Sequence, residues 1–73
     1  MAKTFDQAIE AAAQLWAGEP ELPSLDENEY VRGQVELIAD LFGSPDLEAQ
    51  EFGGDSIKVS VWGTLNDKVK ELA

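Results

Sequence analysis

The residues of this chain that are best suited to chemistry are its carboxylates. Thirteen of the fifteen Asp and Glu residues lie between Thr4 and Ile57, where Arg32 is the only basic residue, so this stretch has a net charge of −12. The whole chain of 73 residues carries −10. A folded surface of one sign attracts partners of the opposite sign and repels nucleic acid and anionic membrane. The charge therefore predicts a basic protein as the partner, and no direct contact with nucleic acid or membrane.

The carboxylates of one expected helix have the spacing of an extended acidic surface. Glu36 and Asp40 are one helical turn apart, and Glu29 falls on the same side. Carboxylates at intervals of about 6 Å along a rigid helix approximate a row of phosphates. Small phage inhibitors that mimic DNA, including some anti-CRISPR and anti-restriction proteins, resemble this chain in size and charge. We therefore expect an inhibitor that occupies the basic groove of a nucleic-acid-binding protein. The candidate partner-binding residues are Glu19, Glu21, Asp26, Glu27, Glu29, Glu36, Asp40 and Trp62.

The composition offers few residues for catalytic, metal or cofactor sites. The chain has no Cys and no His, which excludes disulfides, thiolate chemistry, zinc sites of the Cys/His kind and proton transfer through imidazole. The run Asp26 to Glu29 lacks the alternating ligands and the glycine of an EF-hand loop. We expect no catalytic residue, no metal and no cofactor, and hence no enzyme.

One short segment has a motif. Residues 52–57 read Phe-Gly-Gly-Asp-Ser-Ile, which resembles the phosphopantetheine attachment site of acyl and peptidyl carrier proteins. Residues 31–43 are similar to the first helix of that family. The resemblance implies that Ser56 would carry the cofactor and open a long helix. The residues after Ser56 alternate like a strand, however, so we interpret Ser56 as a turn residue after Gly54-Asp55. A carrier or enzymatic role ranks third among our hypotheses.

The first half of the chain predicts two helices. Thr4 and Gln7 form a capping box for a helix over residues 5–17, which Gly18 and Pro20 end. Asp26 is the expected N-cap of a second helix over residues 27–42, which Gly43 ends. The expected partners at that start are Glu29 in a capping box and Leu25 with Tyr30 in a hydrophobic staple. The predicted core stripes are Phe5, Ile9, Ala12 and Trp16 in the first helix and Val31, Val35, Ile38 and Phe42, with Leu41 beside them, in the second. Gly33 is expected at a close helix crossing.

The second half predicts a hairpin and a short helix. Ile57, Val59 and Val61 alternate with polar residues and Trp62, which is typical of a half-buried strand over residues 57–62. A first strand over residues 47–52 would pair with it through a Gly54-Asp55 turn. Residues 65–72 form the last predicted helix, capped by Thr64. The expected architecture is a single α+β domain over residues 1–73, in the order α-α-β-β-α.

The alternatives concern the use of these surfaces. The carboxylates could be solvated helix faces that serve only solubility, in a small assembly or regulatory module whose hairpin edge pairs with a partner or with itself. Trp62 is expected either under the last helix or at an interface, in a monomer or a homodimer. The start of the chain has no apolar run of the signal-peptide kind, and the longest apolar stretch is three residues, Ala11 to Ala13. We therefore expect a cytoplasmic protein.

Overall fold

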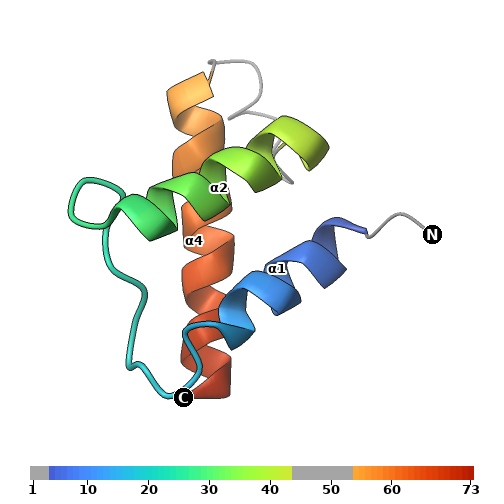
Figure 1. Ribbon diagram of the computed structural model, residues 1–73. Coiled ribbons are helices and arrows are strands. Elements are labelled where there is room, and N and C mark those ends of the chain that lie inside the picture. Colours follow the sequence, from blue (N-terminus) through green and yellow to red (C-terminus); the bar gives the residue numbers. More distant parts are fainter. Residues whose placement is uncertain (1–3, 44–53) are drawn as a thin grey trace.

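The part of the protein that the structure describes is built from helices. The computed structural model describes residues 4–43 and 54–73, and Figure 1 shows its three helices, α1 (Phe5–Gln14), α2 (Glu29–Phe42) and α4 (Gly54–Leu72). No residue of these two ranges lies in a strand. The prediction of an α+β fold is therefore wrong, and the described part of the chain is all-α.

The expected strand over residues 57–62 is part of α4. Ile57, Val61, Leu65 and Val69 recur every four residues along this helix, and the last three are completely buried. Two of the positions that suggested a strand, Ile57 and Val61, fit a helical period equally well, because both periods bring residues i and i+4 to one face. Val59 decides between the two periods. It is 61% exposed, whereas a strand would have placed it on the core side.

The other predicted elements of the second half of the chain have different outcomes. The expected strand over residues 47–52 lies outside the described residues. Gly54 and Asp55, the expected turn, are the first two residues of α4, so the turn is wrong. Residues 65–72 are helical as predicted, but they continue α4 and do not form a separate helix. Thr64 does not cap a helix start, because its hydroxyl donates a hydrogen bond to the Ser60 carbonyl oxygen at 3.1 Å.

The start of α1 agrees with the prediction and its end does not. Thr4 Oγ1 accepts from the Gln7 amide at 3.2 Å, and Gln7 Oε1 accepts from the Thr4 amide at 2.9 Å, which confirms the capping box. The helix ends at Gln14, three residues earlier than expected, and residues 15–18 continue as turns. Gly18 has a φ of 94°, a conformation that favours glycine.

The start of α2 corrects another prediction. Asn28 is the N-cap, since its Oδ1 accepts from the amides of Tyr30 and Val31 at 2.9 and 3.2 Å. The predicted cap at Asp26 and the staple between Leu25 and Tyr30 are wrong, because residues 25–27 form a turn and Tyr30 is 80% exposed. An Asx side chain two residues closer to the apolar stripe made the better cap. Gly43 ends the helix with a φ of 72°, as predicted.

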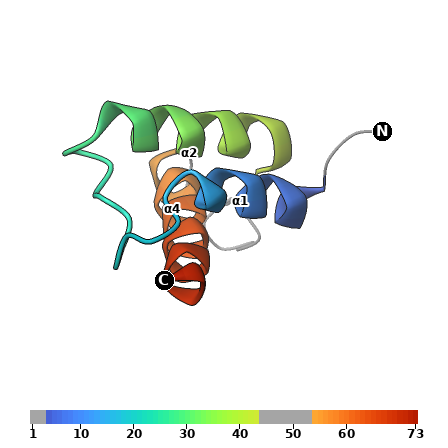
Figure 2. The same ribbon diagram turned by 60° about the horizontal axis from the view of Figure 1, so that its bottom comes forward.

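The helices pack in two layers. In Figures 1 and 2, α1 and α2 lie across α4, with α2 near the N-terminal half of α4 and α1 near its C-terminal half. The buried core between them consists of Ile9, Ala12, Ala13, Leu22, Val31, Val35, Ile38, Val61, Leu65 and Val69. The rings of Phe5 and Phe42 meet edge to face with their centroids 6.2 Å apart. These contacts fix α1 and α2 as neighbours and determine which of their faces remain outside.

Candidate functional site

Three carboxylates form a row along the outer side of α2. Glu29, Glu36 and Asp40 fall within about 40° of one another around the helix axis, because they are seven and four residues apart at 3.6 residues per turn. Glu29 and Asp40 are exposed, and the Glu36 side chain is 44% exposed. We call these three residues the acidic row. Its placement on one rigid helix agrees with the expected spacing.

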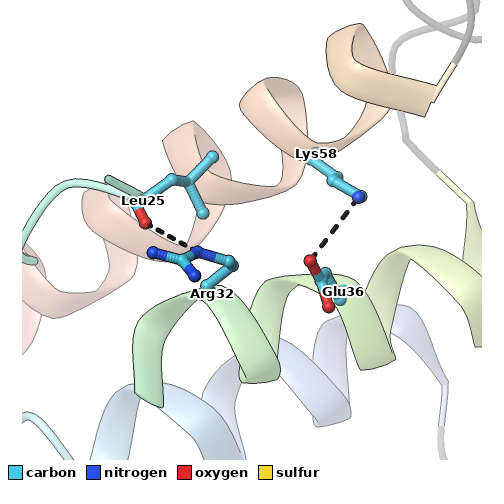
Figure 3. A network of polar contacts seen from close by, with 4 residues as sticks. All are labelled: Leu25, Arg32, Glu36 and Lys58. Atoms are coloured by element: carbon cyan, nitrogen blue, oxygen red, sulfur yellow. Dashed lines mark hydrogen bonds and ion pairs between the residues drawn. The ribbon is translucent and has the colours of Figure 1, made fainter. Parts of the chain in front are cut away.

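One member of the acidic row has a basic neighbour. The Lys58 Nζ lies 3.5 Å from Glu36 Oε1, and Figure 3 shows this ion pair joining α2 to α4. Arg32 lies one turn before Glu36, and its Nε donates to the Leu25 carbonyl oxygen at 3.2 Å. Both side chains of the ion pair are at least about a third exposed, so the pair contributes little to stability. Its main effect is to reduce the local negative charge at Glu36.

The remaining predicted carboxylates lie in the linker between α1 and α2. Glu19, Glu21, Asp26 and Glu27 belong to no helix, and their side chains lie at the surface. The linker is nevertheless anchored, since Leu22 is 2% exposed and its amide donates to Asn66 Oδ1 at 2.8 Å. The structure therefore separates the predicted carboxylates into two groups, the acidic row on α2 and the linker carboxylates.

Trp62 lies on α4 and not on a strand. It is partly buried against the core, and its Nε1 donates to the Pro23 carbonyl oxygen at 2.8 Å. The indole thus holds the linker against α4, and its polar atom has a partner within the protein. A role of Trp62 in partner binding stays a prediction.

A second acidic region lies between α1 and α4. Asp6 and Glu10 of α1 line a shallow depression with Asp67 and Glu71 of α4, and Lys68 is also at this site. The Lys68 Nζ lies 3.4 Å from Glu71 Oε2. Among the described residues, no group of three potential metal ligands is close enough to hold an ion.

An apolar groove that the sequence pattern did not lead us to expect lies between α1 and α2. Leu15, Leu37 and Leu41 line it and are 76%, 61% and 66% exposed. The groove has a volume of about 710 Å³, and its other lining residues are Ala8, Ala11, Ala12, Gln34, Ile38 and Phe42. None of them comes from α4. The signal was present in the sequence, since Tyr30, Gln34, Leu37 and Leu41 follow a second helical stripe beside the core stripe.

The groove and the acidic row share one helix. Around the axis of α2, the Leu37–Leu41 stripe lies between the core stripe and the acidic row, about 100° from each. The α1 side of the groove is lined mainly by the short side chains of Ala8, Ala11 and Ala12. The outer surface of α1 and α2 therefore combines an apolar channel with negative charge along one edge.

The comparisons with known proteins identify no relative. No protein-family model matches the chain, and neither the curated proteins nor the solved structures include one that is significantly similar to it. None of the described helices has the length and apolar character needed to cross a membrane.

Proposed function

We propose that this protein acts by binding another protein, and that its acidic row occupies the basic groove of a nucleic-acid-binding partner. The observation that carries the proposal is the alignment of Glu29, Glu36 and Asp40 on one rigid helix of a chain with a net charge of −10. A rigid element holds charges in register without the loss of backbone freedom that a flexible acidic tail would suffer on binding. In this function the partner is inhibited because nucleic acid no longer reaches its groove.

The density of charge indicates which carboxylates contact the partner directly and which attract it from a distance. The acidic row has three carboxylates in twelve residues, with about 16 Å of helix between the first and the last. Duplex DNA carries about ten phosphates over the same length. The row alone is thus sparser than DNA and supplies short-range contacts, whereas the linker carboxylates contribute to the long-range attraction. Contacts at short range govern dissociation, and peripheral charges govern association.

The experiment starts with capture of a partner from a lysate and a test of whether that partner binds DNA or RNA. The protein should then displace a labelled oligonucleotide from it. Neutralising the acidic row with Glu29→Gln, Glu36→Gln and Asp40→Asn should raise the dissociation rate at least about tenfold, a loss of about 1.4 kcal/mol. Surface-based kinetics would measure both rates.

The linker supplies a control of equal charge. Glu19→Gln, Glu21→Gln and Glu27→Gln also remove three negative charges, from exposed positions outside the helices. This control should slow association and leave dissociation unchanged. Equal effects of the two triple variants on dissociation would show that only the total charge matters, and would contradict the acidic row as the contact. A partner with no affinity for nucleic acid would contradict the proposal altogether.

The position at which α4 begins favours a second candidate function. The helix opens at Gly54, so the Gly-Asp-Ser-Ile segment that resembles a carrier-protein attachment site lies at a helix start, as that resemblance implies. Ser56 is in the first turn and only partly buried, and Ile57 packs against the core. The strand that counted against this role is absent from residues 57–62. These features support Ser56 as an attachment point for phosphopantetheine.

This second function has a direct test. Incubation with coenzyme A and a phosphopantetheinyl transferase of broad specificity should add the mass of one phosphopantetheine group to the intact protein. Ser56→Ala should abolish the addition, whereas Ser60→Ala, one turn further along α4, should leave it unchanged. An unmodified wild-type chain under conditions that load a known carrier protein would exclude the role.

A further inference from the structure

The apolar groove exposes more aliphatic surface than folding requires. Leu15, Leu37 and Leu41 each keep more than 60% of their surface in contact with solvent, in a chain whose described core has only ten buried apolar residues. A contiguous apolar patch on the surface of a small protein marks a binding site more often than a single exposed leucine does. The three leucines converge on one groove, so they form such a patch.

The charges around the groove restrict what can occupy it. No charged residue lines the groove. Asp40 of the acidic row is three residues from Leu37 and lies beside the leucine stripe, whereas Glu36 lies toward α4, where it pairs with Lys58. Arg32 lies about 160° from that stripe around the helix axis and donates to Leu25. Lys58 and Lys68 are paired with carboxylates of α2 and α4. Within the part of the chain that the structure describes, the groove is apolar with a negative edge.

A second copy of this chain is a poor occupant. In a symmetric dimer the same patch lies on both sides of the interface. No basic side chain of the groove lining would then face the acidic row, and two chains that each carry −10 repel one another. An apolar helix with basic residues along one side satisfies both the groove and its edge.

We propose that the groove between α1 and α2 binds an amphipathic helix of the partner, with its apolar stripe on Leu15, Leu37 and Leu41 and its Lys or Arg residues toward the acidic row. Apolar anchors at helical spacing in a groove formed by two helices are an established mode of peptide recognition. Because α2 has 14 residues, an occupant of about four turns would match its length. The inference extends the proposed function and rests on it only for the basic character of the partner.

The test uses a synthetic probe. A fluorescein-labelled peptide of about 14 residues, built from leucine and lysine with leucines at i, i+3, i+4 and i+7, presents the required stripe. Its control has the same composition in scrambled order, so that the charge is equal and the stripe is lost. Fluorescence polarisation at physiological salt should show that the scrambled peptide binds at least about tenfold more weakly. Equal affinities would mean that only charge attracts the peptide, and would overturn the inference.

Variants of the protein locate the contact. Leu37→Ser with Leu41→Ser should weaken binding of the leucine–lysine peptide about tenfold or more, the loss expected for two central anchors. Val59→Ser is the matched control, because Val59 is as exposed as Leu37 but lies on α4 outside the groove. Circular dichroism should show that both variants keep the helical content of the wild type. Unchanged affinity of the Leu37/Leu41 variant, or an equal loss in Val59→Ser, would overturn the inference.

Different results would refute the use of the acidic row and the binding of a helix in the groove. If the variant with the neutralised acidic row still displaces nucleic acid from its partner as well as the wild type, the proposed use of the acidic row is wrong. The peptide assay does not depend on that result, since the stripe-dependent part of the affinity comes from the leucines. Sedimentation equilibrium provides an independent check. A dimer that is lost in the Leu37/Leu41 variant would identify a second copy as the occupant and would overturn the inference.

Discussion

Three side-chain hydrogen bonds join segments that are far apart in the sequence. Asn66 accepts from the Leu22 amide, Trp62 donates to the Pro23 carbonyl, and Trp16 Nε1 donates to Gln34 Oε1 at 2.7 Å. The first two attach the linker to α4, and the third attaches the turn after α1 to α2. Among the described residues, no buried side-chain polar atom lacks a partner. A core of mostly small and medium-sized side chains thus gains its specificity from a few directional contacts.

Removal of the Asn66 amide should be costly. Asn66 is 7% exposed, and Asn66→Ala leaves the buried Leu22 amide without its acceptor. We expect a decrease in the free energy of unfolding of about 1–3 kcal/mol, the usual cost of an unsatisfied buried donor. Urea denaturation followed by circular dichroism would measure it.

The control for this variant is the next residue of the same helix. Asp67 is exposed, and its helix propensity is similar to that of asparagine. Asp67→Ala therefore reports the effect of alanine on α4 without a lost hydrogen bond. If Asn66→Ala is no less stable than Asp67→Ala, the hydrogen bond to Leu22 contributes nothing.

At the level of elements, α4 forms against part of its own composition. The segment from Ile57 to Thr64 contains four β-branched residues and Gly63, and residues of these kinds have lower helix propensity than alanine or leucine. Helix formation is decided instead by burial of Val61, Leu65 and Val69, which are completely inaccessible to solvent. The free energy from a buried face exceeds the propensity differences of several residues.

Two glycines in the helices serve no packing purpose. A Cβ placed on Gly33 or Gly63 would meet no atom within 4 Å, so the close crossing expected at Gly33 is wrong. Gly33→Ala and Gly63→Ala should each raise the free energy of unfolding by about 1 kcal/mol. In a domain of this size, each substitution should raise the melting temperature by about 4–8 °C.

A third glycine gives the matched control for this prediction. A Cβ placed on Gly18 would also meet no atom within 4 Å, but the φ of this residue is 94°. Gly18→Ala should therefore lower the melting temperature, because alanine is strained in that conformation. A lower melting temperature for Gly18→Ala, beside higher ones for Gly33→Ala and Gly63→Ala, would show that backbone conformation and not available space determines the effect. Stabilisation by all three substitutions would mean that the turn after α1 adapts without cost.

For the whole molecule, charge opposes folding. A net charge of −10 on 73 residues raises the free energy of the compact state through self-repulsion. The two ion pairs among the described residues are partly exposed, so they offset little of this repulsion. The acidic surface therefore reduces stability, and a function in binding is one reason for such a surface to persist.

Salt should stabilise the protein. Screening shortens the range of charge repulsion from about 30 Å at 0.01 M ionic strength to about 10 Å at 0.1 M. We expect the melting temperature to rise by about 4–8 °C between low salt and about 0.5 M NaCl, which corresponds to about 1 kcal/mol. A variant that combines the acidic-row and linker neutralisations has a net charge of −4, because six carboxylates are removed from −10. Its melting temperature should rise less, and an equal rise in both proteins would assign the effect to general salting-out.

The sequence by itself determined the features that depend on neighbouring residues. The capping box of Thr4 and Gln7 and the stop at Gly43 need only a few adjacent positions. The core stripes of α1 and α2 follow from one unambiguous period, so Ile9, Val31, Val35 and Ile38 were predicted correctly. The rows of carboxylates also follow from spacing, although their function does not.

Only the tertiary structure decided that residues 54–72 form one helix and that the groove exists. The apolar positions from Ile57 to Val61 fit two periods, and the helix prevails because α1 and α2 bury the face that continues through Leu65 and Val69. The groove depends on the side of α2 that α1 leaves open. The second stripe with Leu37 and Leu41 could have been buried or exposed, and the choice followed from how two helices share a third. Local pattern specifies an amphipathic face, and the packing of the whole chain determines whether that face is core or surface.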